Sequence, residues 1–417
     1  MTFVEKNHDK HRVNNGMLIT GSDEWWQTIS GPQSEACDDR CLVTFWWRDP
    51  AGGEETSSTR RVWIYITGVT DHHQNAVPQT LTRVPGTDAW RWQTTLSPTW
   101  RGSYCFIPSD REDDFAPEIF NVGSPDRMLL REGWRKLLPR AIADPLNPQS
   151  WKGGRGHAVS ALELPQAPEQ PGWSSRNTPA SAPVCIEWRS ARLGNTRRIW
   201  IYTTGDDAPE ERPLAVLLDG QFWAESMPVW PALAGLTHEG KLPPAVYLLI
   251  DVIDNEHRGR ELPCNADFWL AVQEELLPLV HHIAPFSNRA DRTVVAGQSF
   301  GGLAAMFAAL YWPERFGCVL SQSGSYWWPH RGGAGTGLLI ERLSQGQLHP
   351  QGLRIWLEAG EREPLIFRAN QALLSQLQHT QQTIFWRQVD GGHDALCWRG
   401  GLTAGLIQLW QSLSRDH

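Results

Sequence analysis

The chain has 417 residues, of which 38 are lysine or arginine and 46 are aspartate or glutamate, so its formal net charge is −8. An acidic balance argues against general binding to nucleic acid or to anionic membranes. The length favours two domains over a single core. The charged first 20 residues contain no apolar stretch of signal-peptide or membrane-spanning length, so we expect a cytoplasmic protein.

Seven cysteines are scattered along the chain without the spacing of a zinc site, and we expect reduced thiols. The 23 tryptophans mostly occur singly within apolar patterns, which favours core packing.

The first part of the chain, residues 1–165, is predicted to be mostly β. β-Branched and aromatic residues form short runs separated by Gly, Pro, Asp and Asn, and the runs lie at residues 42–48, 61–66, 90–96 and 101–108. This spacing is typical of an immunoglobulin-like β-sandwich. A helix is expected over residues 129–142, leading out of the sandwich.

The composition then shifts to Pro, Gly, Ser and Gln over residues 145–183. This stretch is interpreted as a linker or an irregular covering segment, with residues 166–183 as the linker between domains.

Residues 184–417 alternate predicted strands with helical patterns. Two continuous apolar runs, at 214–218 and 245–250, are typical of strands covered on both faces. The pattern predicts an α/β domain with a mainly parallel sheet and helices on both faces.

A strand, a sharp turn and a helix are predicted around Gly297-Gln298-Ser299-Phe300-Gly301. Four small or β-branched residues precede the motif, and an Ala, Leu and Met run with helical spacing follows it. A turn this tight leaves no room for β-carbons beside the serine, which it holds exposed at a helix N-terminus. Ser299 is therefore the candidate nucleophile.

A serine nucleophile needs a general base and a group that orients the base. His393 lies in the Gly-rich loop Gly391-Gly392-His393-Asp394 after the last predicted strand, and it is the candidate base. The acid is expected after the preceding strand, where Glu358, Glu361 and Glu363 occur. Glu358 is expected still within the strand, so Glu363 is preferred and Glu361 stays open.

The tetrahedral intermediate needs backbone N–H donors. One is expected from Phe300, the residue after the nucleophile, and the other from Gln221, with Gly220 in reserve, in the turn after the strand at 214–218. A simple strand-ending turn explains the latter motif equally well.

Taken together, these motifs resemble the enterochelin (enterobactin) esterase family within the esterase-D-like α/β hydrolases. The resemblance also rests on Leu218 to Trp223, on Asp254 to Leu262, and on Ser321-Gln322-Ser323-Gly324-Ser325-Tyr326-Trp327-Trp328. It is dense over the C-terminal domain and weaker over the N-terminal domain.

The resemblance implies a cytoplasmic serine esterase that hydrolyses the triserine lactone of ferric enterobactin-type catecholate siderophores and so releases iron. No cofactor or metal ligand is expected, because iron arrives with the substrate. A trianionic, flat-faced ligand needs cations and aromatic rings. The substrate-binding residues implied are Arg258, Arg260, Tyr326, Trp327, Trp328, His330 and Arg331. A surface salt bridge is the alternative for Arg258, and core packing for the tryptophans.

Three other functions stay open at this point. A β-sandwich joined to an esterase-D-like domain also suits a carbohydrate esterase that releases acetyl or feruloyl groups. A catalytically inactive siderophore-binding protein is the second, and acyl transfer to an acceptor other than water is the third.

Overall fold

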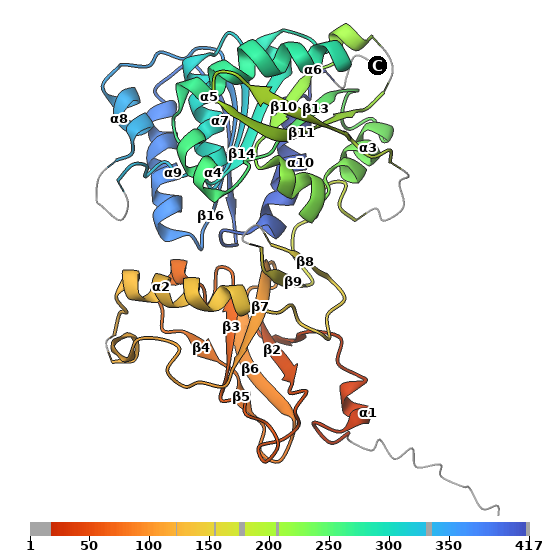
Figure 1. Cartoon of the computed structure of the whole chain (residues 1–417), viewed down its shortest axis with the longest axis vertical. Coiled ribbons are helices and arrows are strands. Elements are labelled where there is room, and N and C mark those ends of the chain that lie inside the picture. Colours follow the sequence, from red (N-terminus) through yellow and green to blue (C-terminus); the bar gives the residue numbers. More distant parts are fainter. Residues whose placement is uncertain are drawn as a thin grey trace, which may run out of the picture.

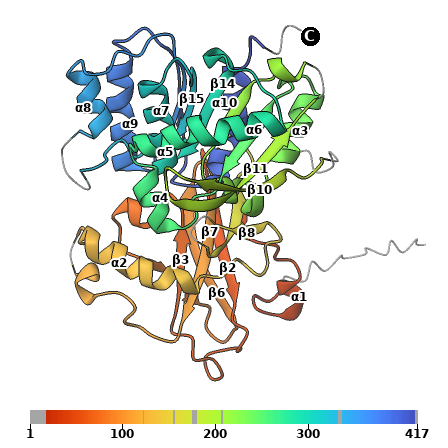
Figure 2. The ribbon, with the colours of Figure 1, turned by 45° about the horizontal axis from the view of Figure 1, so that its top comes forward.

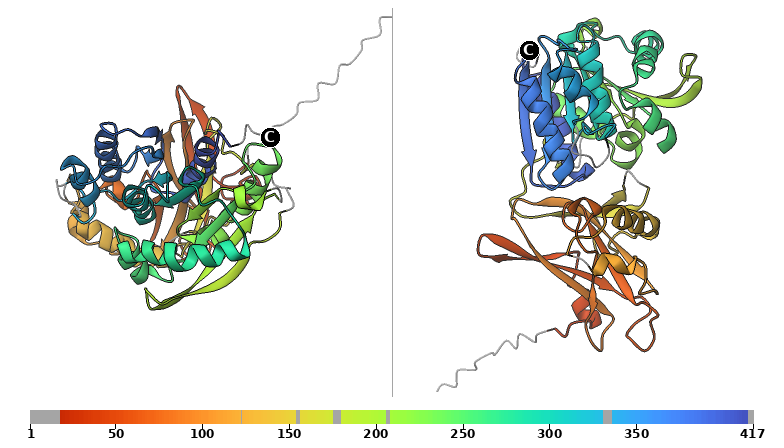
Figure 3. Two further views of the ribbon diagram at one scale, coloured as in Figure 1. Left: turned by 90° about the horizontal axis from the view of Figure 1, so that it is seen from above. Right: turned by 90° about the vertical axis from the view of Figure 1, so that its left-hand side faces the viewer.

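The computed structural model describes residues 18–121, 123–153, 156–174, 180–205, 208–330 and 336–413. These residues form two parts stacked along the long axis of the molecule, an N-terminal β-rich part and a C-terminal part of strands and helices (Figures 1 and 2). The right-hand view of Figure 3, turned by 90° about the vertical axis, shows the same division.

The N-terminal part, called here the N-terminal sandwich, contains two antiparallel sheets, in the orders β1-β2-β6-β5 and β4-β3-β7-β9-β8. The strands are β1 (Gln33–Cys37), β2 (Arg40–Arg48), β3 (Arg61–Ile66), β4 (Gln79–Thr80), β5 (Thr82–Arg83), β6 (Ala89–Leu96), β7 (Arg101–Ser109), β8 (Ser150–Lys152) and β9 (Ala158–Glu163). The helices are α1 (Asp23–Trp26) and α2 (Arg127–Leu137).

Alternation of side chains along the strands builds two cores on the β3–β7 sheet. Ile64 and Phe106 face the other sheet and pack with Phe45 of β2. The intervening residues, such as Tyr65, face outward and pack beneath Trp134 of α2. The four strands predicted from sequence are confirmed within one or two residues. The immunoglobulin-like shape is not confirmed, because a helical layer covers the outer face of one sheet.

The expectation of irregular chain after residue 145 was wrong in part. β9 pairs with β7, from Arg101 opposite Glu163 to Tyr104 opposite Ser160, and extends the sheet. The segment that follows also packs closely, since the Gln170 amide donates to Leu396 O (2.7 Å) and Trp173 Nε1 donates to Arg399 O (2.8 Å). Residues 175–179 of the predicted linker lie outside the described residues.

The C-terminal part is built on an eight-stranded sheet in the order β10-β11-β13-β12-β14-β15-β16-β17. The strands are β10 (Val184–Ser190), β11 (Asn195–Thr203), β12 (Leu214–Leu217), β13 (Val246–Ile250), β14 (Thr293–Gln298), β15 (Cys318–Gln322), β16 (Arg354–Gly360) and β17 (Thr383–Val389). The helices are α3 (Trp230–His238), α4 (Asn255–Glu261), α5 (Ala266–Ala271), α6 (Leu277–Ile283), α7 (Phe300–Tyr311), α8 (Leu338–Ser344), α9 (Pro364–Leu377) and α10 (Ala395–Leu409).

The sheet is mixed: β10 pairs with β11 and β11 with β13 in antiparallel fashion, whereas the six strands β12 to β17 are parallel to one another. Its central strands are wholly buried because helices cover both faces. Val295 faces the helical layer that contains α5, α7 and α9, whereas its neighbour Ala296 faces the layer that contains α3 and α10. Parallel strands bring their carboxyl ends to one edge, and the loops there carry the candidate site.

A substitution in helix α2 tests whether this helix stabilises the N-terminal sandwich. Trp134→Ala should lower the free energy of unfolding by about 3 to 5 kcal/mol, because it empties a site enclosed by Tyr65 and Phe115. Urea denaturation followed by circular dichroism measures this loss. Met128→Ala on the same helix, at a side chain 82% exposed, is the control. An equal effect of both changes would show that α2 does not seal a core.

Candidate active site

Ser299 occupies a strained turn between β14 and α7. Its backbone φ is 59° and ψ is −122°, a conformation that a residue with a β-carbon adopts only under tertiary constraint. A β-carbon added to Gly297 would lie 2.2 Å from Gly301 O, so glycine is required there. The predicted strand, turn and helix are confirmed, and the turn presents the hydroxyl at the carboxyl edge of the sheet.

His393 and Glu363 are brought together by the loops after two neighbouring strands. His393 follows β17 and Glu363 follows β16, and His393 Nδ1 lies 2.5 Å from Glu363 Oε1. A carboxylate only accepts, so Nδ1 is the donor and Nε2 is left to accept a proton. Of the predicted carboxylates, Glu363 is thus the one that contacts the histidine.

Glu363 is fully buried, and the hydrogen bonds of its carboxylate come from the ends of three strands. Oε2 accepts from Gly360 N (2.8 Å) and from Ser323 Oγ (2.7 Å), while Oε1 faces the imidazole. Glu361 is exposed, and Glu358 lies inside β16 as expected. A buried carboxylate with these donors holds an imidazole in one orientation and stabilises the imidazolium.

The Ser299 hydroxyl lies 3.5 Å from Ser325 Oγ, and Ser325 N donates to Ser299 O (3.2 Å). Within the described ranges, Ser325 is the side chain to which this hydroxyl hydrogen-bonds. The first N–H groups of α7, beginning with Phe300, have no carbonyl of their own helix to bind. They lie beside the serine and can bind a developing oxyanion.

The second predicted oxyanion turn is held by an ion pair. Asp219, at φ 50°, precedes Gly220 and Gln221, and its carboxylate accepts from Arg258 Nε (2.8 Å) and Nη2 (3.0 Å). Arg258 Nη2 also reaches Gln298 O at 3.5 Å. The Gln221 side chain accepts from Val252 N (3.2 Å). Arg258 therefore ties this turn to the end of the serine strand.

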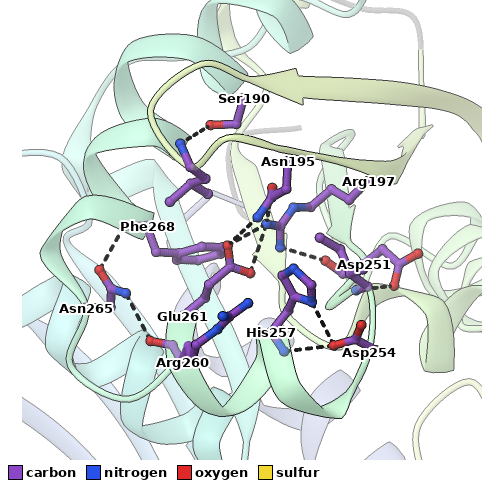
Figure 4. A network of polar contacts seen from close by, with 12 residues as sticks. Ser190, Asn195, Arg197, Asp251, Asp254, His257, Arg260, Glu261, Asn265 and Phe268 are labelled. Carbon is purple, nitrogen blue, oxygen red and sulfur yellow. Dashed lines mark hydrogen bonds and ion pairs between the residues drawn. The ribbon is translucent and has the colours of Figure 1, made fainter.

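Helix α4, which carries Arg258, is fixed from below by a buried ion pair (Figure 4). Arg197 Nη2 donates to both carboxylate oxygens of Glu261, at 2.9 and 2.7 Å. Arg197 also lies over the rings of Trp188 and Phe268. Because breaking such a pair leaves an uncompensated charge, the pair fixes where α4 sits.

The aromatic residues predicted to contact substrate differ in how deeply they are buried. Tyr326 is buried, and its hydroxyl binds Ser321 Oγ (2.5 Å) and Gly302 O (3.2 Å), so its assignment as a ligand contact was wrong. Trp328 is partly buried against the core, and the Trp327 ring lies 6.0 Å from that of Phe300.

The remaining predicted cations differ in their surroundings. Arg260 is exposed and lies 3.6 Å from Glu256, and His330 is exposed and lies 3.5 Å from Glu341. Arg331 lies outside the described residues.

Sequence reasoning missed Ser323 and Trp398. Trp398 Nε1 donates to Ser323 Oγ (3.0 Å), and its ring meets the His393 ring edge-on at 4.7 Å. Ser323 has φ 49° and directly follows β15. A polar residue at the end of a parallel strand was the available signal for Ser323, whereas nothing local marks Trp398.

A polar network beneath the site joins three adjacent strands. Gln298 Nε2 donates to Gln322 Oε1 (3.0 Å), and Gln322 Nε2 donates to Glu358 Oε2 (2.6 Å). Burial raises the pKa of Glu358 from 4.5 to about 7, although the charge of Arg387 opposes the rise. The network therefore holds a proton that an exposed carboxyl would release.

As pH rises from 4.5 to 7, the free energy of unfolding of the Glu358→Gln variant should increase relative to that of the unchanged protein. Over that window the unfolded chain releases a proton that the folded Glu358 retains, so the unchanged protein loses up to about 3 kcal/mol. Urea denaturation of both proteins at pH 5, 6, 7 and 8 measures the difference. Glu187→Gln, at an exposed carboxyl, is the control. A difference that does not depend on pH would contradict the assignment.

Among the described residues, none of the helices combines the length and the hydrophobicity that a membrane span requires. In the same residues, no group of three or more His, Cys, Asp or Glu side chains is arranged to hold a metal ion.

Two family models match the chain. Residues 42–173 match the model described as "Enterochelin esterase, N-terminal", and residues 190–409 match "Putative esterase". The iron(III) enterobactin esterase of Escherichia coli O6:H1 is 67% identical over 401 residues, which cover 96% of this chain and 99% of that protein.

Solved structures agree with these matches. The crystal structure of the ferric enterobactin esterase from Salmonella typhimurium superposes with a TM-score of 0.91 at 68% identity, over 94% of this chain and 100% of that one. The Shigella flexneri enterobactin esterase, crystallised in the presence of enterobactin, has a TM-score of 0.88 at 66% identity, over 95% and 100%. By sequence and by structure, the chain belongs to the enterobactin esterase family.

Proposed function

We propose that this chain is a serine esterase that hydrolyses the triserine lactone ester bonds of ferric enterobactin-type catecholate siderophores in the cytoplasm and so lowers their hold on iron. The single observation that carries the proposal is the Glu363–His393 pair at the same sheet edge as the strained Ser299 turn. It occurs in a chain 67% identical to an iron(III) enterobactin esterase over 96% of its length.

The fold supports this chemistry. The strand order, with β13 and β12 exchanged and the serine after β14, suits the α/β hydrolase architecture, in which serine, acid and histidine follow in that order along the chain. We propose a domain division at residues 1–165 and 184–417, with 166–183 between them. No cofactor is needed, because iron enters as part of the substrate.

In the proposed reaction, His393 Nε2 removes the Ser299 proton as the hydroxyl attacks a serine-ester carbonyl. Glu363 holds the imidazole through Nδ1 and stabilises its positive charge. The backbone N–H groups of Phe300 and Gln221 bind the oxyanion. The alcohol leaves with the proton from His393, and water then hydrolyses the acyl-enzyme by the same route.

Substrate recognition is proposed to use cations and rings beside the serine. A ferric tris-catecholate carries three negative charges on flat faces. Arg260 and His330 are exposed, Trp327 and Trp328 are partly buried, and Arg258 is engaged by Asp219. We therefore assign the exposed cations to the ligand and Arg258 mainly to the oxyanion turn.

Ser299→Ala should abolish ester hydrolysis while leaving ferric siderophore binding roughly intact, because only the nucleophile is lost. Products from ferric enterobactin, separated by chromatography, measure the hydrolysis, and quenching of tryptophan fluorescence measures the binding. Ser344→Ala, on the exposed surface of α8, is the control. Retained turnover would reject Ser299 as nucleophile.

The same chromatographic assay distinguishes the alternative function. Release of acetate or ferulate from an acylated sugar without cleavage of ferric enterobactin would favour a carbohydrate esterase.

Arg258→Ala should lower kcat about tenfold or more on both ferric enterobactin and p-nitrophenyl acetate, because the turn that carries the Gln221 N–H loses its ion pair. Steady-state kinetics on the two esters measure this. Arg192→Ala removes an arginine that pairs with Glu274 at the surface and is the control. A rise in KM for the siderophore alone would return Arg258 to substrate binding.

A further inference from the structure

The residues on both sides of His393 are held by the N-terminal sandwich. After it, Asp394 is buried and uses its two carboxylate oxygens differently. Oδ1 accepts from Leu396 N (2.9 Å) and caps α10, whereas Oδ2 accepts from Ser103 N (2.6 Å) and Ser103 Oγ (2.9 Å) of β7. The start of α10 is thereby fastened to the neighbouring sandwich.

Before the histidine, Gly392 lies directly against Gly68, in the turn that follows β3. A β-carbon built on Gly68 would lie 2.9 Å from Gly392 N, and one built on Gly392 would lie 2.6 Å from Gly68 N. The two backbones are thus in contact with no space for a side chain. The histidine loop rests on this turn and cannot move toward the sandwich.

The turn is itself braced against the acid loop. The buried carboxylate of Asp71 accepts from Gly68 N (3.1 Å) and from Gln74 Nε2 (3.0 Å), and Gln74 Nε2 also reaches Arg362 O (2.7 Å). Arg362 precedes Glu363, and its guanidinium contacts Gly68 O (3.4 Å) and Asp390 Oδ1 (2.9 Å). Both loops that supply the Glu363–His393 pair therefore contact the same turn.

Two further observations place this turn beside the imidazole. The His73 ring lies 5.4 Å from the His393 ring. Burial raises the pKa of Asp71 to about 6, and the charges of Glu363 and His393 also act on it, the first raising and the second lowering its pKa. Charged groups influence one another in this way only when they lie close together in a poorly solvated region.

We propose that residues 67–74 and Ser103 of the N-terminal sandwich are positioning residues for His393, so that the sandwich takes part in catalysis by holding the general base. The inference rests on the proposed function in one respect, the role of His393 as base. A base displaced by about an ångström transfers protons poorly even when its own chemistry is unchanged. The competing role for the sandwich is substrate binding alone.

Gly68→Ala tests the proposal, because its new methyl group must push Gly392 away. We expect kcat to fall roughly ten- to hundredfold on both ferric enterobactin and p-nitrophenyl acetate, with KM for the siderophore changed less than about threefold. The small ester needs almost no binding surface, so a loss on both substrates reports the base.

Gly86→Ala is the matched control. Gly86 lies in the same sandwich with φ +73°, close to the +83° of Gly68, and a β-carbon there meets nothing within 4 Å. Both changes introduce the same kind of left-handed backbone strain. Only Gly68→Ala acts on the histidine loop, so Gly86→Ala should keep the kcat of the unchanged protein.

Gln74→Ala is the second variant and keeps the proposal testable if Gly68→Ala does not fold. It removes the bridge from Asp71 to Arg362 O without adding atoms, and we expect about a threefold to tenfold loss of kcat on both esters. Kinetics of Gly68→Ala and Gln74→Ala equal to those of Gly86→Ala, or a change confined to KM for the siderophore, would overturn the proposal. If the unchanged protein cleaves p-nitrophenyl acetate but not ferric enterobactin, the proposed function fails, while the comparison of variants still decides this inference.

Discussion

The buried carboxylate of Glu363 is the constraint on which the site depends. A charged group without solvent must be met by donors, and here each donor comes from a different strand end: Gly360 at the end of β16, Ser323 after β15 and His393 after β17. Satisfying this one group fixes three loops relative to one another. The parallel sheet supplies the edge at which they meet.

Ser299 illustrates the complementary constraint, which is backbone strain. Its positive φ is maintained because β14 and α7 are both buried and leave the turn no alternative. Gln322, the last residue of the neighbouring strand β15, and Ser325, in the loop after it, hydrogen-bond to its backbone. Strain and buried charge thus meet at one sheet edge, with the stable sheet offsetting the cost of both.

The sequence was sufficient for the parts of the fold that local pattern determines. Apolar runs predicted β12, β13 and β14, and glycines beside Ser299 and His393 predicted the turns, because a tight turn constrains nearby residue types directly. Strand order limited the candidate acid to Glu363, which was preferred, and Glu361; in the structure Glu363 is buried against His393, whereas Glu361 is exposed. The prediction for Tyr326 failed because a motif places a residue near a strand end without saying which way its side chain turns.

Contacts between segments that are far apart in the chain could not be predicted from the sequence. Ser103 and Asp394 are 291 residues apart, and neither has a local signature of the other. Helix α2 was expected to lead out of the sandwich, yet it packs on one of its sheets. The apolar face of a helix predicts that this face is buried, but it does not identify the element that buries it.

The order of contacts along the chain has a consequence for how activity arises during synthesis. Gly68, Ser103, Ser323 and Glu363 all precede His393, whereas Trp398, whose ring packs edge-on against the imidazole, follows it. A nascent chain would therefore carry Ser299 without its candidate base until β17 and the loop after it have been made. Activity would then arise late, when His393 reaches Glu363, Trp398 packs against the imidazole and Asp394 docks on Ser103.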